Sequence, residues 1–205
     1  MDYQHEIKAI KKWLGAGSIN IFGLPYSGKD TVGLTLASGL DAEFISSGQL
    51  LRRVQEKDQS EGFMSPTNVF KDVVLPVFHN ENYANKPLIL SSVGRWHGEE
   101  QSVIETTKNS GHPLKVVLYI EINEDEIYRR MNMAYNLGDR SGRLDDNKEI
   151  IQVRLAEFKE KTLPVIENYR NMGLLIDING IGEREKIMER VIKKLYSFTK
   201  TEKTS

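Results

Sequence analysis

The chain has 205 residues, a formal net charge of −1 and no cysteine. This length allows one sizeable hydrophobic core and is too short for two full domains, so we expect a single domain with insertions. The lack of cysteine excludes a disulfide framework, a thiol nucleophile and a thiolate metal site. The sequence has no long basic block, which argues against nucleic-acid binding, and no apolar run of membrane-spanning length. We therefore expect a cytoplasmic protein whose partners are small molecules.

The first sixteen residues predict an amphipathic helix that precedes the first strand. Ile7, Ile10, Trp13 and Leu14 fall on one face of such a helix. We interpret it as a helix packed on the domain surface rather than one that binds a membrane.

Residues 23–31 read Gly-Leu-Pro-Tyr-Ser-Gly-Lys-Asp-Thr and have the pattern of a phosphate-binding loop. An apolar strand at 18–22 precedes them and a helix is expected at 31–40. The glycines allow backbone amides to approach phosphate oxygens, the lysine adds a positive charge, and the helix presents its positive end. The residues assigned to this nucleotide site are Gly23, Pro25, Tyr26, Ser27, Gly28, Lys29, Asp30 and Thr31.

Strands and helices alternate along the rest of the chain. Further strands are expected at 42–46, 86–90, 115–120 and 174–178, with helices at 47–52 and 99–109 and a last helix after the fifth strand. This pattern predicts an α/β three-layer sandwich with a five-stranded parallel sheet, and sites outside the carboxyl ends of its strands. Residues 197–205 are expected to form a frayed tail.

A set of arginines is suitably placed along the chain to surround a phosphate in transfer, whose charge is shared among several oxygens. For each arginine the ordinary alternative is a solvated side chain or a surface ion pair. The candidates are Arg52, Arg95, Arg130, Arg140, Arg143 and Arg154.

With these segments the chain resembles the adenylate kinase family of nucleoside monophosphate kinases, from about Ile19 to about Leu195. Besides the phosphate loop, the resemblance rests on Ile-Ser-Ser-Gly-Gln-Leu-Leu-Arg at 45–52, Ser-Gly-Arg-Leu-Asp-Asp-Asn at 141–147, and 154–169. It implies one kinase domain over 1–205 with the fold of P-loop nucleoside triphosphate hydrolases. It also implies a reduced monophosphate-binding insertion at about 46–82 and a short, metal-free lid at about 130–145.

The resemblance implies a role for each candidate. Lys29, Arg95, Arg143 and Arg154 would be catalytic: Lys29 would hold the donor phosphates, and Arg143 and Arg154 would bridge the two substrates. Arg130 would lie along the donor base. The remaining donor residues would be Arg140, in place of a lid arginine aligned with Ala134, and Gly180 in the loop around the adenine. The acceptor residues would be Ser47, Gly48, Arg52, Met64, Arg95 and Glu99.

Two aspartates that the family places near Mg²⁺ are replaced here by Gln49 and Ser91. Their loss weakens the metal site, because Mg²⁺ prefers hard oxygen ligands. Asp30, directly after Lys29, is the candidate that would compensate, facing the ion directly or through water. The alternative is that Asp30 only favours the first turn of its helix. Both readings stay open here.

The acceptor site also departs from the family. Glu99 falls in the register of a glutamine that reads adenine, and its carboxylate suits the two adjacent donors of guanine better. Gln101 would instead contact adenine if the turn after Arg95 is longer than in the family. The hydroxyl of Ser47 favours AMP as acceptor. Trp96 and His97 are expected to pack under this loop.

We therefore expect a monomeric, adenylate kinase-like phosphotransferase that uses ATP with Mg²⁺ and takes AMP as acceptor. One alternative is the same chemistry on another small acceptor such as GMP. The other is a non-catalytic or weakly active ATP-binding protein, which Gln49 and Ser91 support and the set of arginines opposes.

Overall fold

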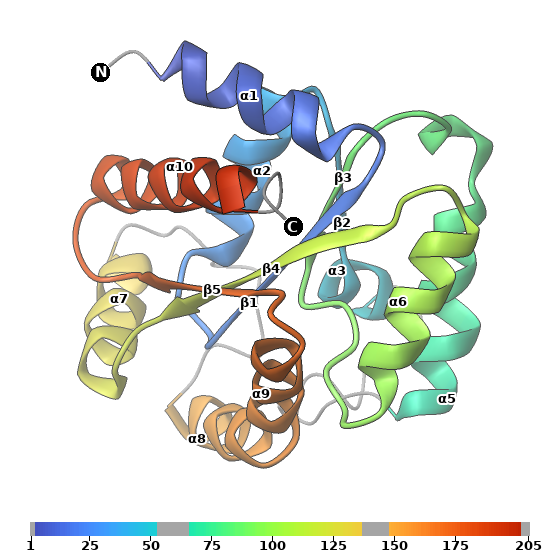
Figure 1. Ribbon diagram of the computed structural model, residues 1–205. Coiled ribbons are helices and arrows are strands. Elements are labelled where there is room, and N and C mark those ends of the chain that lie inside the picture. Colours follow the sequence, from blue (N-terminus) through green and yellow to red (C-terminus); the bar gives the residue numbers. More distant parts are fainter. Residues whose placement is uncertain (1–2, 53–65, 137–147, 202–205) are drawn as a thin grey trace.

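The computed structural model describes residues 3–52, 66–136 and 148–201. Its centre is a five-stranded, all-parallel sheet in the order β2-β3-β1-β4-β5. Helices cover both faces of this sheet (Figure 1). The fold class predicted from the sequence is confirmed. The strands are β1 (Ser18–Gly23), β2 (Glu43–Ser46), β3 (Leu88–Ser91), β4 (Leu114–Glu121) and β5 (Leu175–Asn179).

The helices of the described residues connect these strands in the expected alternating order. They are α1 (Gln4–Leu14), α2 (Lys29–Leu40), α3 (Ser47–Arg52), α5 (Thr67–Val69), α6 (Glu99–Asn109), α7 (Glu124–Asn136), α8 (Lys148–Glu157), α9 (Leu163–Asn171) and α10 (Arg184–Thr201). Short helical segments of other types are η1 (Phe70–Val74), η2 (Leu75–His79), η3 (Glu81–Tyr83) and η4 (Phe158–Thr162).

The sheet is buried on both faces because its strands are apolar along their length. All six residues of β1 are buried. Ile19 and Ile21 pack into a core shared with α1, α2 and α10, whereas Phe22 packs on the opposite face against α8 and α9. Burial of two apolar layers is the main favourable contribution to such a fold. It fixes the carboxyl ends of the strands at one edge, where the candidate site lies.

The amphipathic first helix lies on the domain surface, as predicted. Ile10 and Leu14 are buried, and Ile7 and Trp13 pack against the same core. The rings of Trp13 and Phe198 meet edge to face with their centroids 6.0 Å apart. Helix α1 therefore packs on the end of α10. No helix in the described part of the chain combines the length and apolarity needed to cross a bilayer.

The contact with α1 corrects the prediction of a frayed tail from residue 197. Helix α10 continues to Thr201, and Thr199 is buried. Phe198 is partly buried and packs against the core, which anchors the last turn in a way that the sequence alone did not reveal. Residues 202–205 lie outside the described residues.

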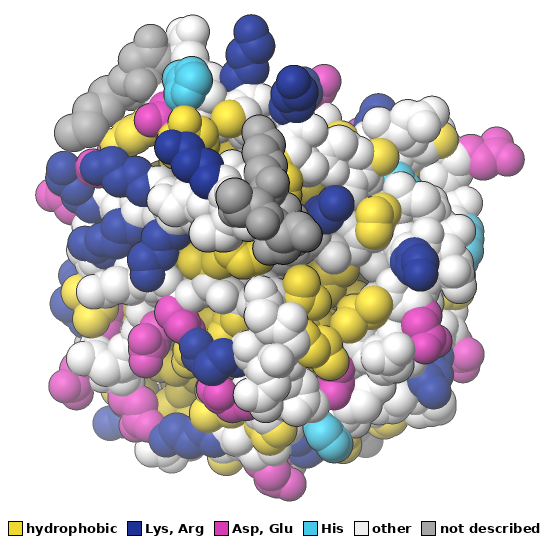
Figure 2. Space-filling model, viewed as in Figure 1, with side chains coloured by type: hydrophobic (Ala, Val, Ile, Leu, Met, Phe, Trp, Pro, Cys, Tyr) yellow, Lys and Arg dark blue, Asp and Glu magenta, His cyan; other side chains and the backbone are white. Residues whose placement is uncertain are grey.

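Lys and Arg side chains gather over α10 on the face shown in Figure 2. Part of this positive charge is compensated within the helix. Glu189 pairs with Lys186 at 3.2 Å and with Lys193 at 2.7 Å. These contacts are the ion pairs of a solvated helix surface.

Candidate functional site

A cavity of about 810 Å³ opens at the carboxyl edge of the sheet. It is lined by segments that follow β1, β2, β3 and β5 and by residues of α7, α8 and α10. A volume of this size accommodates ligands of nucleotide size, and the location is where parallel α/β sheets bind ligands. Most of the predicted residues that the structure describes line it: Gly23, Pro25, Tyr26, Ser27, Gly28, Lys29, Asp30, Thr31, Ser47, Gly48, Arg52, Arg95, Arg130 and Arg154.

The phosphate loop connects β1 to α2 in the predicted way. Gly28, the residue before α2, has φ +85°, a conformation that glycine adopts without strain. A Cβ atom at Gly23 would overlap the Ser27 side chain, so this position also requires glycine. The amide of Ser27 donates to the carbonyl oxygen of Leu24 at 3.1 Å. The loop therefore curls before the amino end of α2, where backbone amides and the Lys29 ammonium suit a polyphosphate.

Asp30 contacts the end of a neighbouring strand. The hydroxyl of Ser91, the last residue of β3, donates to Asp30 Oδ1 at 2.5 Å, and both residues line the cavity. Thr31 and Ser92 line it as well. The carboxylate and the hydroxyl oxygens are hard ligands of the kind that Mg²⁺ accepts. This part of the cavity therefore fits a Mg²⁺ ion held by one carboxylate, bound water and nucleotide phosphates.

Among the described residues no group of three or more histidine, cysteine, aspartate or glutamate side chains could hold a metal by itself. In phosphate-transferring enzymes Mg²⁺ is commonly bound by one or two carboxylates together with the substrate phosphates.

Three arginines line the other part of the cavity. Arg52 ends α3, Arg95 follows β3, and Arg154 lies on α8. Burial, and next the positive charge of Arg154, lower the pKa of Arg95 to about 10. Arg95 is still charged at neutral pH, and Arg52 also repels it. Guanidinium groups that repel one another favour an anion between them, and a phosphate is suitable because it accepts several hydrogen bonds.

A hydrogen bond and a cation–π contact connect the turn that carries Arg95 to η4. The hydroxyl of Thr162 donates to the Arg95 carbonyl oxygen at 3.2 Å, and the Lys161 ammonium lies 4.1 Å from the centroid of the Trp96 ring. Trp96 is half-buried, as its predicted packing role requires. His97 is exposed, and its Nδ1 lies 3.2 Å from Nδ2 of the Asn168 side chain.

Glu99 has a different place from the one expected. It is buried and does not line the cavity, and its Oε2 accepts hydrogen bonds from the amides of Arg95 and Trp96 at 2.8 and 3.0 Å. This geometry makes it a support of the Arg95 turn, and its direct contact with the acceptor base stays a prediction. Gln101 is exposed and donates to Glu105 at 2.9 Å.

Ser47 lines the cavity but its hydroxyl is already engaged. It donates to the carbonyl oxygen of Ser92 at 2.5 Å and lies 3.3 Å from that of Ser91. The hydroxyl thus joins the start of α3 to the end of β3. Its predicted contact with an adenine acceptor stays a prediction.

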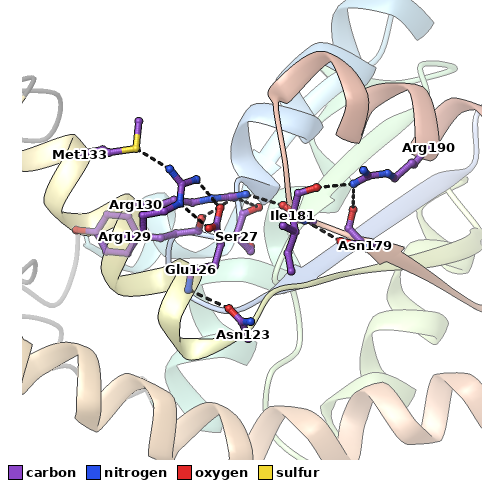
Figure 3. Close-up of polar contacts among 11 residues, drawn as sticks. Ser27, Asn123, Glu126, Arg129, Arg130, Met133, Asn179, Ile181 and Arg190 are labelled. Carbon is purple, nitrogen blue, oxygen red and sulfur yellow. Dashed lines mark hydrogen bonds and ion pairs between the residues drawn. The ribbon is translucent and has the colours of Figure 1, made fainter.

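Residues of α7 and of the turn after β5 also line the cavity. Figure 3 shows the polar contacts around these two segments. Arg130 donates to the Gly180 carbonyl oxygen at 2.5 Å and to those of Tyr26 and Ser27 at 3.1 Å each. The resemblance implied that Arg130 lies along the donor base. In the structure its guanidinium joins the phosphate loop to the Gly180 turn. Its contact with the donor base stays a prediction.

The Gly180 turn is also held from α10. Arg190 donates to the carbonyl oxygens of Asn179 and Ile181 at 2.9 and 2.6 Å, and the Ile181 amide donates to Asn179 Oδ1 at 2.9 Å (Figure 3). These bonds fix the backbone that the resemblance places beside the donor base.

Other functional candidates were missed by sequence reasoning. Arg129 and Met133 of α7, with Ile187 and Met188 of α10, also line the cavity. The spacing of Glu126 from Arg129 and Arg130, at i+3 and i+4, was a signal of their ion pairs. The predicted residues Met64, Arg140 and Arg143 lie outside the described residues.

A parallel sheet in this order, with a glycine-lysine loop between β1 and α2 and a cationic cavity at its carboxyl edge, defines a P-loop phosphotransferase. A gluconokinase from Sinorhizobium meliloti has a similar structure, with a TM-score of 0.64 at 17% identity, covering 90% of this chain and 94% of that one. At this identity the likeness supports the fold alone.

Sequence comparison identifies the family. The family profile described as Adenylate kinase matches residues 21–174. The adenylate kinase of Prochlorococcus marinus is 30% identical over 180 residues, covering 84% of this chain and 95% of the relative. That of Thermobifida fusca is 27% identical over 186 residues, covering 86% and 97%. The chain belongs to the adenylate kinase family. It is a phosphotransferase with a phosphate group as acceptor, of the nucleoside monophosphate kinase class.

Proposed function

We propose that this protein transfers the γ-phosphate of Mg²⁺-bound ATP to AMP. The observation that carries the proposal is the single cavity lined by Lys29 of the phosphate loop together with Arg52, Arg95 and Arg154. The phosphate loop suits a triphosphate and the three arginines suit a monophosphate. Both line the same cavity. Two nucleotides bound there would meet at their phosphates.

The reaction needs little covalent chemistry from the protein. A phosphate oxygen of the acceptor forms a bond to the γ-phosphorus, and the bond from that phosphorus to the β-phosphate oxygen breaks with its electron pair on the departing ADP. Lys29 would neutralise the donor phosphates. Arg95 and Arg52 would orient the acceptor phosphate, and Arg154, on the cavity wall, would neutralise charge on the group in transfer.

The bound Mg²⁺ would supply charge neutralisation at the donor phosphates. We propose Asp30 as its one carboxylate partner, directly or through water. The hydrogen bond from Ser91 supports this role because it fixes the carboxylate at the cavity wall, next to Lys29 and Thr31. The carboxylate thus moves from the strand ends, where the family has it, to the start of α2.

Recognition of AMP is a further part of the proposal. Glu99 is withdrawn from the cavity, so the acceptor would be held mainly through its phosphate, and another acceptor such as GMP would compete. The short lid at about 130–145 and the reduced insertion at about 46–82 would cover the two nucleotides and exclude water. A single kinase domain over 1–205, a monomeric state and a cytoplasmic location belong to the same proposal.

The test is a coupled assay with ATP, Mg²⁺ and a panel of nucleoside monophosphates. The proposal predicts ADP formation with AMP as the best acceptor, a loss of at least about 100-fold in kcat for Lys29→Met, and a raised KM for AMP in Arg95→Met. Lys12→Met, a change on the exposed face of α1, is the control. Tight ATP binding without transfer to any acceptor would contradict the proposal and support an ATP-binding protein.

A further inference from the structure

Strained backbone occurs at the cavity. Among the described residues other than glycine, positive φ angles occur at Tyr26, Asp41, Asn85 and Ser92. Asp41 and Asn85 are exposed, and aspartate and asparagine adopt this left-handed conformation readily because their side chains bond the local backbone. Tyr26 and Ser92 line the cavity instead. Tyr26, with φ +61°, is the bulky residue of the four, for which the conformation is a genuine outlier.

The left-handed conformation of Tyr26 shapes the phosphate loop. Gly28, two residues later, has φ +85°, and Ser27 between them has a negative φ. The sign of φ therefore alternates along this part of the loop. Such alternation turns successive backbone amides towards one side and forms a concavity that binds anions. If Tyr26 relaxed to a right-handed conformation, the alternation would be lost and the amides would point in different directions.

Contacts of two kinds hold Tyr26 in this conformation. Its carbonyl oxygen and that of Ser27 each accept a hydrogen bond of 3.1 Å from Arg130 Nη1 (Figure 3). Its side chain packs against the apolar cluster that contains Phe22 and Phe158. The backbone is thus bound from α7 and the ring is held by the core. A strained residue persists only where its surroundings fix it in this manner, and such residues are concentrated at functional sites.

We propose that Tyr26 is a positioning residue for the donor phosphates. Its packed ring holds the phosphate loop in the left-handed shape that binds a triphosphate, so the loop does not rearrange when the nucleotide binds. This inference rests on the proposed function and deepens it. The glycine-lysine motif fixes the residues at the ends of the loop and leaves position 26 open. The role assigned to Tyr26 therefore comes from the conformation and contacts of this chain.

The test compares side chains at position 26 by calorimetric titration with ATP and with inorganic tripolyphosphate. Tyr26→Ala removes the ring but keeps the cost of a left-handed backbone, and is expected to weaken both ligands about five- to thirtyfold. Tyr26→Gly also removes the ring, yet glycine adopts the conformation freely, so a loss of only about two- to threefold is expected. A side chain that only filled space would give the opposite order, because glycine fills less space than alanine.

Tyr26→Phe tests the part played by the ring. Phenylalanine keeps the aromatic ring that packs on the core, and is expected to recover the binding that Tyr26→Ala loses to within about threefold. Should Tyr26→Ala fail to fold, Tyr26→Asn takes its place. Asparagine adopts the left-handed conformation less freely than glycine, so Tyr26→Asn is expected to bind both ligands more weakly than Tyr26→Gly.

Asn85→Ala and Asn85→Gly are the matched controls. Asn85 has φ +63°, is exposed and does not line the cavity. The same pair of substitutions therefore changes backbone strain at a distance from the phosphate loop. Both variants are expected to leave both titrations unchanged.

The proposal is overturned if Tyr26→Gly binds tripolyphosphate as weakly as Tyr26→Ala or more weakly, or if Tyr26→Ala binds it like the unsubstituted protein. It is likewise overturned if Tyr26→Phe binds as weakly as Tyr26→Ala, since the ring would then not hold the loop. If the unsubstituted protein binds neither ATP nor tripolyphosphate, the proposed function fails and this assignment fails with it. The first titration thus tells the two failures apart.

Discussion

The hydroxyl of Ser91 donates a hydrogen bond of 2.5 Å to the carboxylate of Asp30. This contact joins the carboxyl end of β3 to the first turn of α2, directly at the phosphate loop. The resemblance places an aspartate of the family at the position of Ser91, and Asp30 is the carboxylate that we propose in its place.

Asp30→Asn is expected to raise the Mg²⁺ concentration for half-maximal ATP binding about tenfold, because the charged oxygen ligand that we propose for the ion would be lost. Binding of metal-free ATP is expected to stay equal or to strengthen, since a negative charge near the phosphates is removed. Titrations of ATP at fixed Mg²⁺ concentrations measure both effects. Asp41→Asn, beyond the end of α2, is the control. A stability loss of about 0.5–1 kcal/mol with unchanged Mg²⁺ dependence would instead show that Asp30 serves only the start of the helix.

The variant Glu99→Gln tests whether Glu99 positions Arg95 or contacts the acceptor base. The carboxylate accepts the amides of Arg95 and Trp96 and lies close enough to favour the charged form of Arg95. We expect a severalfold higher KM for AMP and for GMP, with the ratio of their kcat/KM values unchanged. A changed ratio would mean that Glu99 contacts the base after all. Steady-state kinetics with both acceptors provide the measurement, with Gln101→Glu as the control.

The contribution of Glu126 to stability is expected to depend on pH. Hydrogen bonds from Arg129 and then from Arg130 lower the pKa of Glu126 from 4.5 to about 2. Because the folded pKa lies below the unfolded pKa, the stabilisation is complete above about pH 5 and is lost as the pH falls through about 2. The free energy of unfolding of Glu126→Gln is expected to be lower by about 1–3 kcal/mol at pH 7.

Denaturant titrations of both proteins between pH 7 and pH 3 test this dependence, and the difference between them is expected to shrink toward pH 3. Glu160→Gln, an exposed glutamate of η4, is the control. A difference that stays constant over this range would show that the ion pairs contribute no net stability.

Gly94, one residue before Arg95, is expected to tolerate no side chain. It has φ +74°, and a Cβ atom would lie 2.7 Å from Val103 Cγ2. Gly94→Ala is expected to lower the free energy of unfolding by about 2–4 kcal/mol, from backbone strain and overpacking together. Gly173→Ala is a matched control, because Gly173 has φ +72° and open space around its Cβ position. Equal losses in the two variants would mean that packing against Val103 contributes nothing.

The fold was predictable because its strongest signals are local. Apolar runs such as 115–120 are buried strands, and the glycine-lysine loop occurs between a strand and a helix, as its chemistry requires. Alternating strands and helices then leave little choice of architecture. The convergence of Arg52, Arg95 and Arg154 on one cavity follows from the same topology.

The contacts of single side chains were less predictable because they depend on segments distant in sequence. Arg130 binds carbonyl oxygens more than 100 residues away, and its alignment with a base-contacting arginine gave no sign of this. Glu99 does not line the cavity, and its carboxylate accepts hydrogen bonds from two backbone amides of its own turn. The end of α10 was misjudged because its polar residues hide the packing of Phe198 on Trp13.

The central claim is that one cavity holds a donor and an acceptor nucleotide end to end. It is tested most directly by calorimetric titration with a compound in which two adenosines are joined by a chain of five phosphates. We predict one molecule bound per chain, competition by both ATP and AMP, and weaker binding in each of Lys29→Met and Arg95→Met. Competition by ATP alone, with Arg95→Met binding as tightly as the unsubstituted protein, would contradict the claim.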